Sequence, residues 1–101
     1  MTTLKPDIIA TVHFAPTDKG GRESPIIQPV FGCIFEHGEQ ANDCRLLLEG
    51  KGDIWPGQKI TIPMLFLCPD LVRPRIKVGD RFQLREARVI AHGVIDEIMF
   101  E

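Results

Sequence analysis

The chain has 101 residues, of which 44% are hydrophobic, so it can form one domain (residues 1–101) with its own apolar core. Twelve lysine and arginine residues stand against 14 aspartate and glutamate residues, and the formal charge of −2 argues against strong non-specific binding of nucleic acid. The sequence contains neither a run of 18 apolar residues nor a signal segment near residue 1, which predicts a cytoplasmic protein that does not span a membrane.

The first predicted element is a strand over residues 8–15, because apolar side chains alternate with the others there. Glycine and proline residues in the turn over residues 16–21 end this strand. A second strand is predicted over residues 29–36. Gly32 within it indicates a bulge or a close approach of another backbone segment.

The next segment, residues 37–42, is polar and predicts a loop. A third strand is expected over residues 43–48, although its run of leucines would also suit a helix. Pro56 and Gly57 are typical of a turn, and Trp55 before them either caps one end of the fold or, if exposed, anchors a contact with a partner.

Residues 59–67 alternate as a fourth strand, in which Pro63 indicates an edge position or a bulge. The segment 68–74 has no regular pattern. Two further strands, residues 81–85 and residues 89–99, are separated by a short polar turn.

Six short strands without a sustained helical period predict an all-β fold, and we expect a small closed antiparallel β-barrel of about six strands. The pattern alone suits a β-sandwich equally well. Closure favours the barrel, because a closed sheet exposes no edge strand to other chains.

Positive charge is concentrated in residues 73–88. This segment holds six basic and two acidic residues, a balance of +4, whereas the rest holds six basic and twelve acidic residues, a balance of −6. A basic segment on an acidic body can attract phosphate or an acidic partner, but basic residues on solvated strand faces give the same pattern. The basic residues are Arg73, Arg75, Lys77, Arg81, Arg85 and Arg88.

Residue types that support catalysis or metal binding are scattered. The three cysteines, Cys33, Cys44 and Cys68, lack ligand spacing and are interpreted as small buried hydrophobic residues rather than a disulfide or zinc site. None of the three histidines lies near a nucleophile motif. The sequence therefore predicts no enzymatic activity, no cofactor and no metal.

Four short motifs follow one another along the chain. Residues 20–26 read G-G-R-E-S-P-I, and Pro56-Gly57 precedes an alternating strand that ends before Pro69. Residues 81–86 read R-F-Q-L-R-E, and residues 93–95 read G-V-I. In this order and spacing, nearly the whole chain resembles the third, C-terminal β-barrel domain of elongation factor Tu. The resemblance implies the same barrel and a binding role rather than a catalytic one.

In that family the domain contacts the T-stem backbone of aminoacyl-tRNA and docks against the GTPase domain. The resemblance places Arg85 and Glu86 at the tRNA-facing turn, and Gly20 and Gln83 on the side of the GTPase domain. The residues that we expect to bind RNA or a partner are Arg22, Arg81, Gln83, Arg85, Glu86 and Arg88, and the expected interdomain-like surface comprises Gly20 and Gly21.

The chain also departs from the family. It lacks the G-x-x-x-x-G-K-[ST] motif, so we expect no bound nucleotide. Ala87 stands where the family has a pair of glycines, and Gln83 replaces a small residue. The expected partner is therefore either RNA, most plausibly tRNA, or a translation-factor partner protein. In the second case the chain would be a protein-interaction module that mimics the domain, for example of the immunity or inhibitor type.

Overall fold

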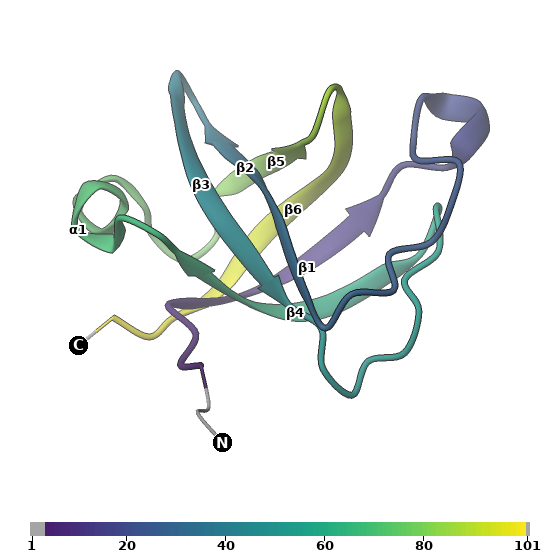
Figure 1. Cartoon of the computed structure of the whole chain (residues 1–101). Helices are drawn as coiled ribbons and strands as arrows, with labels where there is room; N and C mark the ends of the chain where they lie inside the picture. The colour runs from purple at the N-terminus through teal and green to yellow at the C-terminus, as the bar shows by residue number, and fades with distance from the viewer. Residues whose placement is uncertain (1–3, 101) are drawn as a thin grey trace.

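Buried and exposed side chains alternate along six strands, which close into an antiparallel barrel in the computed structural model (Figure 1). The structure describes residues 4–100; residues 1–3 and 101 of the predicted domain lie outside this part. Around the barrel the order is β1-β4-β3-β2-β5-β6, so the first and last strands are neighbours. The predicted closed all-β barrel is confirmed. Its strands are β1 (Ile8–Phe14), β2 (Val30–His37), β3 (Gln40–Leu47), β4 (Lys59–Phe66), β5 (Arg81–Arg85) and β6 (Val89–Ile98).

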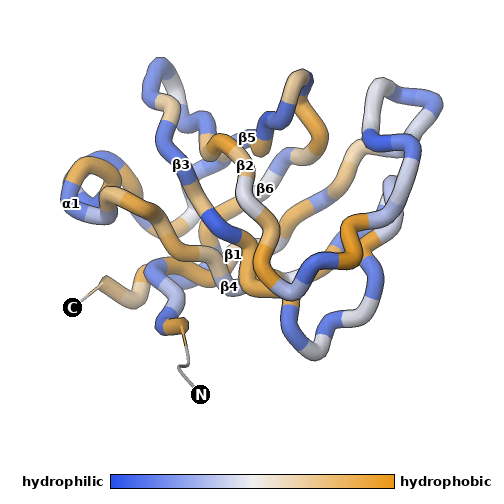
Figure 2. Tube along the Cα trace, viewed as in Figure 1, coloured by the Kyte–Doolittle hydropathy of each residue, from blue (hydrophilic) through white to orange (hydrophobic). Residues whose placement is uncertain are grey.

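The predicted loop over residues 37–42 was wrong in its extent. β2 continues to His37 and β3 begins at Gln40, which leaves a two-residue turn. Gly38 in this turn has a φ of +60°, a left-handed conformation that glycine adopts without strain. The segment is polar because it forms the tip of a hairpin, coloured mainly blue in Figure 2, where ladder hydrogen bonds hold the strands without a buried face.

Three short helical turns connect the strands. A 3₁₀ turn, Thr17–Lys19, follows β1, and α1 (Pro69–Val72) and a second 3₁₀ turn (Arg73–Arg75) follow β4. Residues 68–74, for which no regular pattern was expected, thus contain one helical turn that Pro69 begins at the first helical position. Within residues 4–100 no helix combines the length and the apolar character needed to cross a membrane.

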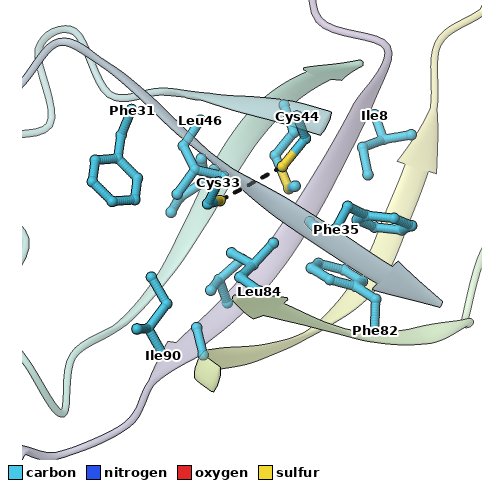
Figure 3. Packing of buried hydrophobic residues seen from close by; sticks show 14 of the residues in the cluster. Ile8, Phe31, Cys33, Phe35, Cys44, Leu46, Phe82, Leu84 and Ile90 are labelled. Atoms are coloured by element: carbon cyan, nitrogen blue, oxygen red, sulfur yellow. Dashed lines mark hydrogen bonds between the residues drawn. The ribbon is translucent and has the colours of Figure 1, made fainter. Parts of the chain in front are cut away.

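Aliphatic side chains and phenylalanine rings together fill the interior of the barrel (Figure 3). The Phe35 ring packs edge-on against Phe66, with centroids 4.9 Å apart, and stacks on Phe82 at 4.7 Å. Phe82 in turn covers Gly93, where a Cβ atom would collide with the ring. The glycine on β6 therefore makes room for a large side chain from β5.

Two of the three cysteines belong to this core. Cys33 and Cys44 are opposite one another in the β2–β3 register, and their Sγ atoms are 3.6 Å apart (Figure 3). The hydrogen bond to Cys33 and burial both raise the pKa of the Cys44 thiol. Both residues are the small buried hydrophobes that the sequence predicts, whereas the prediction was wrong for Cys68, which is exposed.

The expected bulge or close backbone approach at Gly32 was wrong: the β2–β3 register runs through it without a shift, and the group that comes close is a side chain. Gly32 faces outward opposite Arg45 on β3, and a Cβ atom at this position would lie 3.0 Å from a guanidinium nitrogen of Arg45. This side chain lies across the outer wall of the barrel.

Candidate functional site

β5 carries three of the predicted site residues on one face. Phe82 and Leu84 point into the core, so the alternation of the strand turns Arg81, Gln83 and Arg85 toward the outer wall. The neighbouring strands β2 and β6 flank this face. The structure therefore brings together the part of the predicted site that lies on a single strand.

Glu36 on β2 engages two of these three side chains. One of its carboxylate oxygens accepts a hydrogen bond from Gln83 Nε2 at 2.6 Å and another from Arg85 Nε at 3.0 Å. The bond from Gln83 and then that from Arg85 hold the pKa of Glu36 below its usual range, since both favour the ionised carboxylate. Arg85 is thus already paired with an acidic group, and a phosphate would have to compete with Glu36 for it.

Arg22 and Glu86 form a second ion pair at 2.5 Å. The Arg22 guanidinium also lies 5.1 Å above the centroid of the Phe31 ring, and its Nε donates to the Ser24 carbonyl at 3.3 Å. Thr17 Oγ1 donates to the Arg22 carbonyl at 2.7 Å. These contacts fasten the loop after β1 to the β5–β6 turn, so Arg22 has a clear structural role.

Gly20 and Gly21 form the tight turn that precedes Arg22. Gly20 is exposed and has a φ of +89°. Gly21 is buried, and a Cβ atom there would collide with the backbone of Ala15. Of the two predicted interdomain-like residues, only Gly20 offers an exposed surface to a partner.

Arg81 and Arg88 complete the set of predicted arginines. Both residues are exposed, and within residues 4–100 neither side chain makes an ion pair or a hydrogen bond. Asp80, next to Arg81, is occupied by other groups, because its carboxylate lies 2.9 Å from His37 Nε2 and accepts the Lys77 backbone N–H at 3.1 Å. Arg81 and Arg88 are therefore available to an anionic ligand.

The basic segment 73–88 does not gather on one patch. Arg73 lies 5.4 Å above the Phe100 ring, beside the segment that precedes β1. The backbone bond from Met99 N to the Asp7 carbonyl, at 2.8 Å, places both ends of the described chain in this region (Figure 1). Arg73 is thus remote from the outer face of β5, and the segment's charge does not act as a unit.

Other basic side chains, which the charge count did not single out, join Arg81 from neighbouring strands. In the barrel register, Lys59 on β4 is opposite His13 on β1, His13 is opposite His92 on β6, and His92 is opposite Gln83. All of these positions alternate with buried residues and therefore face outward. The alternation in the sequence places each of these residues on the outward face of its own predicted strand. Only the order of the strands around the barrel shows that the residues lie close together.

No protein-family model and no curated protein sequence matches this chain. The likeness to the third domain of elongation factor Tu therefore stays a prediction, and the function has to be inferred from the geometry of the residues themselves.

Proposed function

We propose that the chain is a non-catalytic RNA-binding module that contacts the phosphate backbone of tRNA through the outer face of the β5–β6 hairpin. The observation that carries this proposal is that Arg81 and Arg88 are exposed and unpaired within residues 4–100. They lie on the strand and the turn of the hairpin. A guanidinium group recognises phosphate through several N–H donors in one plane.

The paired arginines would have a supporting role in this module. Arg22 holds Glu86, and Arg85 holds Glu36, so both help to fix the hairpin surface. Contacts to the backbone alone orient RNA without reading its sequence. A tRNA partner or a translation-factor partner would also imply a cytoplasmic location.

Two arginines that are unpaired within residues 4–100, on an acidic protein, predict moderate affinity with a shallow dependence on salt. Each neutralised phosphate contributes about −0.7 in a single strand and about −0.9 in a duplex to the slope of log affinity against log salt concentration. Two such contacts therefore predict a slope of about −1.4 to −1.8. Steeper dependence would mean that further cationic groups take part.

Titration of the protein into fluorescently labelled tRNA, with and without an attached amino acid and at two salt concentrations, tests the proposal. The double variant Arg81→Gln/Arg88→Gln should weaken binding and make the slope shallower. The double variant Lys51→Gln/Arg75→Gln removes the same charge from exposed positions elsewhere and should bind like the wild type. Absence of binding at low salt, or equal losses in both variants, would refute the hairpin as an RNA-binding surface.

An exposed apolar group favours a second function, that of a protein-interaction module. Ile26 and Ile54 are buried and joined by an isolated antiparallel bridge, so the residues that follow them, Ile27 and Trp55, point outward. Their exposed fractions are 70% and 57%. An exposed tryptophan is typical of the anchor of a protein interface. Binding of this kind should withstand high salt and be lost in Trp55→Ala. RNA binding should instead weaken at high salt and be unaffected by Trp55→Ala.

A further inference from the structure

A shallow hollow of about 580 Å³ lies on the outer wall where β5, β6, β1 and β4 meet. Its polar lining consists of Thr11, His13, Lys59, Arg81 and His92. Four strands contribute these side chains, so their arrangement is fixed by the closed sheet rather than by a loop. A rigid wall keeps the groups in place before any ligand arrives.

Among the described residues, no carboxylate lines this hollow. Asp96, the nearby acid on β6, accepts a hydrogen bond from Thr11 Oγ1 at 2.6 Å. Glu36 on β2 is the next acid around the barrel, and it is engaged by Gln83 and Arg85. The Lys59, Arg81, His13 and His92 side chains make no hydrogen bond or ion pair within residues 4–100. The hollow therefore presents two permanent cations and two histidines that pair with no carboxylate of this part of the chain, while Asp96 keeps its negative charge at the Thr11 edge.

His13 and His92 are directly opposite one another on neighbouring strands. Side chains at opposite positions of an antiparallel pair have Cβ atoms about 5 Å apart, close enough for one ligand to contact both. Two protonated histidines at this distance repel each other, and Lys59 and Arg81 add to the repulsion. An anion between them removes that penalty, so anion binding and protonation favour each other.

The chemistry of the lining selects an anion rather than a metal ion. A bound metal needs further ligands besides two imidazoles, and residues 4–100 contain no group of three or more histidine, cysteine, aspartate or glutamate side chains that could hold one. Lysine and arginine close by would also repel a cation. A phosphate group suits the site, since its oxygens can accept hydrogen bonds from imidazolium, ammonium and guanidinium groups together.

We propose that this hollow binds a phosphate group through Arg81 and Lys59, and that protonation of His13 and His92 strengthens the binding as pH falls from about 8 to 6. The inference rests on the proposed function for the source of the phosphate, the RNA backbone. It adds a site away from the β5–β6 turn and a dependence on pH that arginine contacts alone would not give. Arg81 belongs to both surfaces, so RNA that follows β5 could place one phosphate in the hollow.

Inorganic phosphate is the probe that tests the site without RNA. In a two-dimensional NMR titration at pH 6 and pH 8, the largest shifts should come from Arg81, His13 and His92 and should saturate. Each histidine that gains a proton should tighten binding roughly two- to fivefold, the range expected for one exposed ionic contact. Inorganic phosphate itself gains a proton between pH 8 and pH 6, so the variants are compared at the same pH. His13→Gln/His92→Gln should bind phosphate more weakly than the wild type at pH 6 and equally at pH 8, while the control Lys51→Gln should match the wild type at both.

The second arm repeats the measurement with labelled tRNA at both pH values. Tighter tRNA binding at pH 6 that is lost in His13→Gln/His92→Gln would support the hollow as an RNA-backbone site. Saturable phosphate binding without tRNA binding would support the site and refute the RNA proposal. If tRNA binds but neither the histidine pair nor Lys59→Gln affects it, the hollow is excluded while the RNA proposal stands. Phosphate shifts spread over all exposed basic residues without saturation would overturn the inference.

Discussion

Arg22 and Glu86 stand 64 positions apart in the sequence, and their ion pair at 2.5 Å joins the loop after β1 to the β5–β6 turn. The side chains are partly shielded, with exposed fractions of 21% and 34%. The Phe31 ring beneath the guanidinium adds a cation–π contact. Three separate segments of the chain thus meet at one arginine.

We expect Arg22→Ala to lower the free energy of unfolding by about 1 kcal/mol, because it removes the ion pair and the ring contact together. Urea denaturation at neutral pH measures this change. Arg88→Ala is the matched control: it removes an exposed arginine from the same hairpin turn and should change the stability by less than about 0.5 kcal/mol. Equal stability of the two variants would mean that the Arg22 contacts do not hold the loop.

Glu36 should titrate at an unusually low pH. Its pKa is lowered first by the hydrogen bond from Gln83 and then by that from Arg85, so an NMR titration of its carboxyl should give a midpoint below the ordinary value of about 4.3. Gln83→Ala and Arg85→Ala should each raise this midpoint, since each removes a group that favours the ionised carboxylate. A midpoint at the ordinary value in the wild-type protein would contradict both hydrogen bonds.

The same carboxyl should influence stability in acid. Because its pKa is lower in the folded than in the unfolded chain, the ionised form stabilises the fold above the unfolded pKa. That stabilisation disappears as pH falls from about 4.3 through the folded pKa. Glu36→Gln should therefore lose less stability than the wild type over this range, which urea midpoints measured from pH 6 to pH 3 would show.

Most strand positions could be predicted from the sequence because side chains that point into the barrel alternate with side chains that point outward along much of each strand. The β5 strand was expected over residues 81–85 and is found at Arg81–Arg85. Alternation fails at residues 37–42, where a hairpin tip extends beyond the core and needs no apolar face. A one-turn helix such as α1 is too short to show a helical period.

The candidate site was less predictable than the fold. That Arg22 meets Glu86, and Arg85 meets Glu36, depends on how strands distant in sequence pair when the barrel closes. His13 was expected on a strand and His92 on a strand face, but only the β1–β6 register makes them neighbours. Composition shows how many charges a chain has, and the order of its strands decides which of them meet.

Gly93 should tolerate no larger residue. A Cβ atom here would collide with the Phe82 ring, which is itself held between Phe35 and β6. We expect Gly93→Ala to destabilise the protein by about 1–3 kcal/mol, the usual cost of overfilling a core. Thermal or urea unfolding measures this cost, and His92→Ala at the adjacent outward position should stay within about 0.5 kcal/mol. If Gly93→Ala is as stable as the wild type, Phe82 can move aside.

The three cysteines should differ in reactivity. Cys33 and Cys44 are buried in contact with each other, and the raised pKa of Cys44 keeps its thiol protonated and poorly nucleophilic. Cys68 is exposed at the start of α1. A chromogenic disulfide reagent should therefore modify one thiol per folded chain rapidly and the other two only slowly. In denaturant all three thiols should react rapidly.

The variant Cys68→Ser provides the control for this assignment. It should abolish the rapid phase and leave the slow reaction of the other two thiols unchanged, because its side chain lies outside the core. Slow modification then reports opening of the β2–β3 region, since the reagent must enter the barrel to reach either sulfur. Rapid loss of all three thiols from folded protein would show that the barrel opens readily between β2 and its neighbours, in conflict with the packing around Cys33 and Cys44.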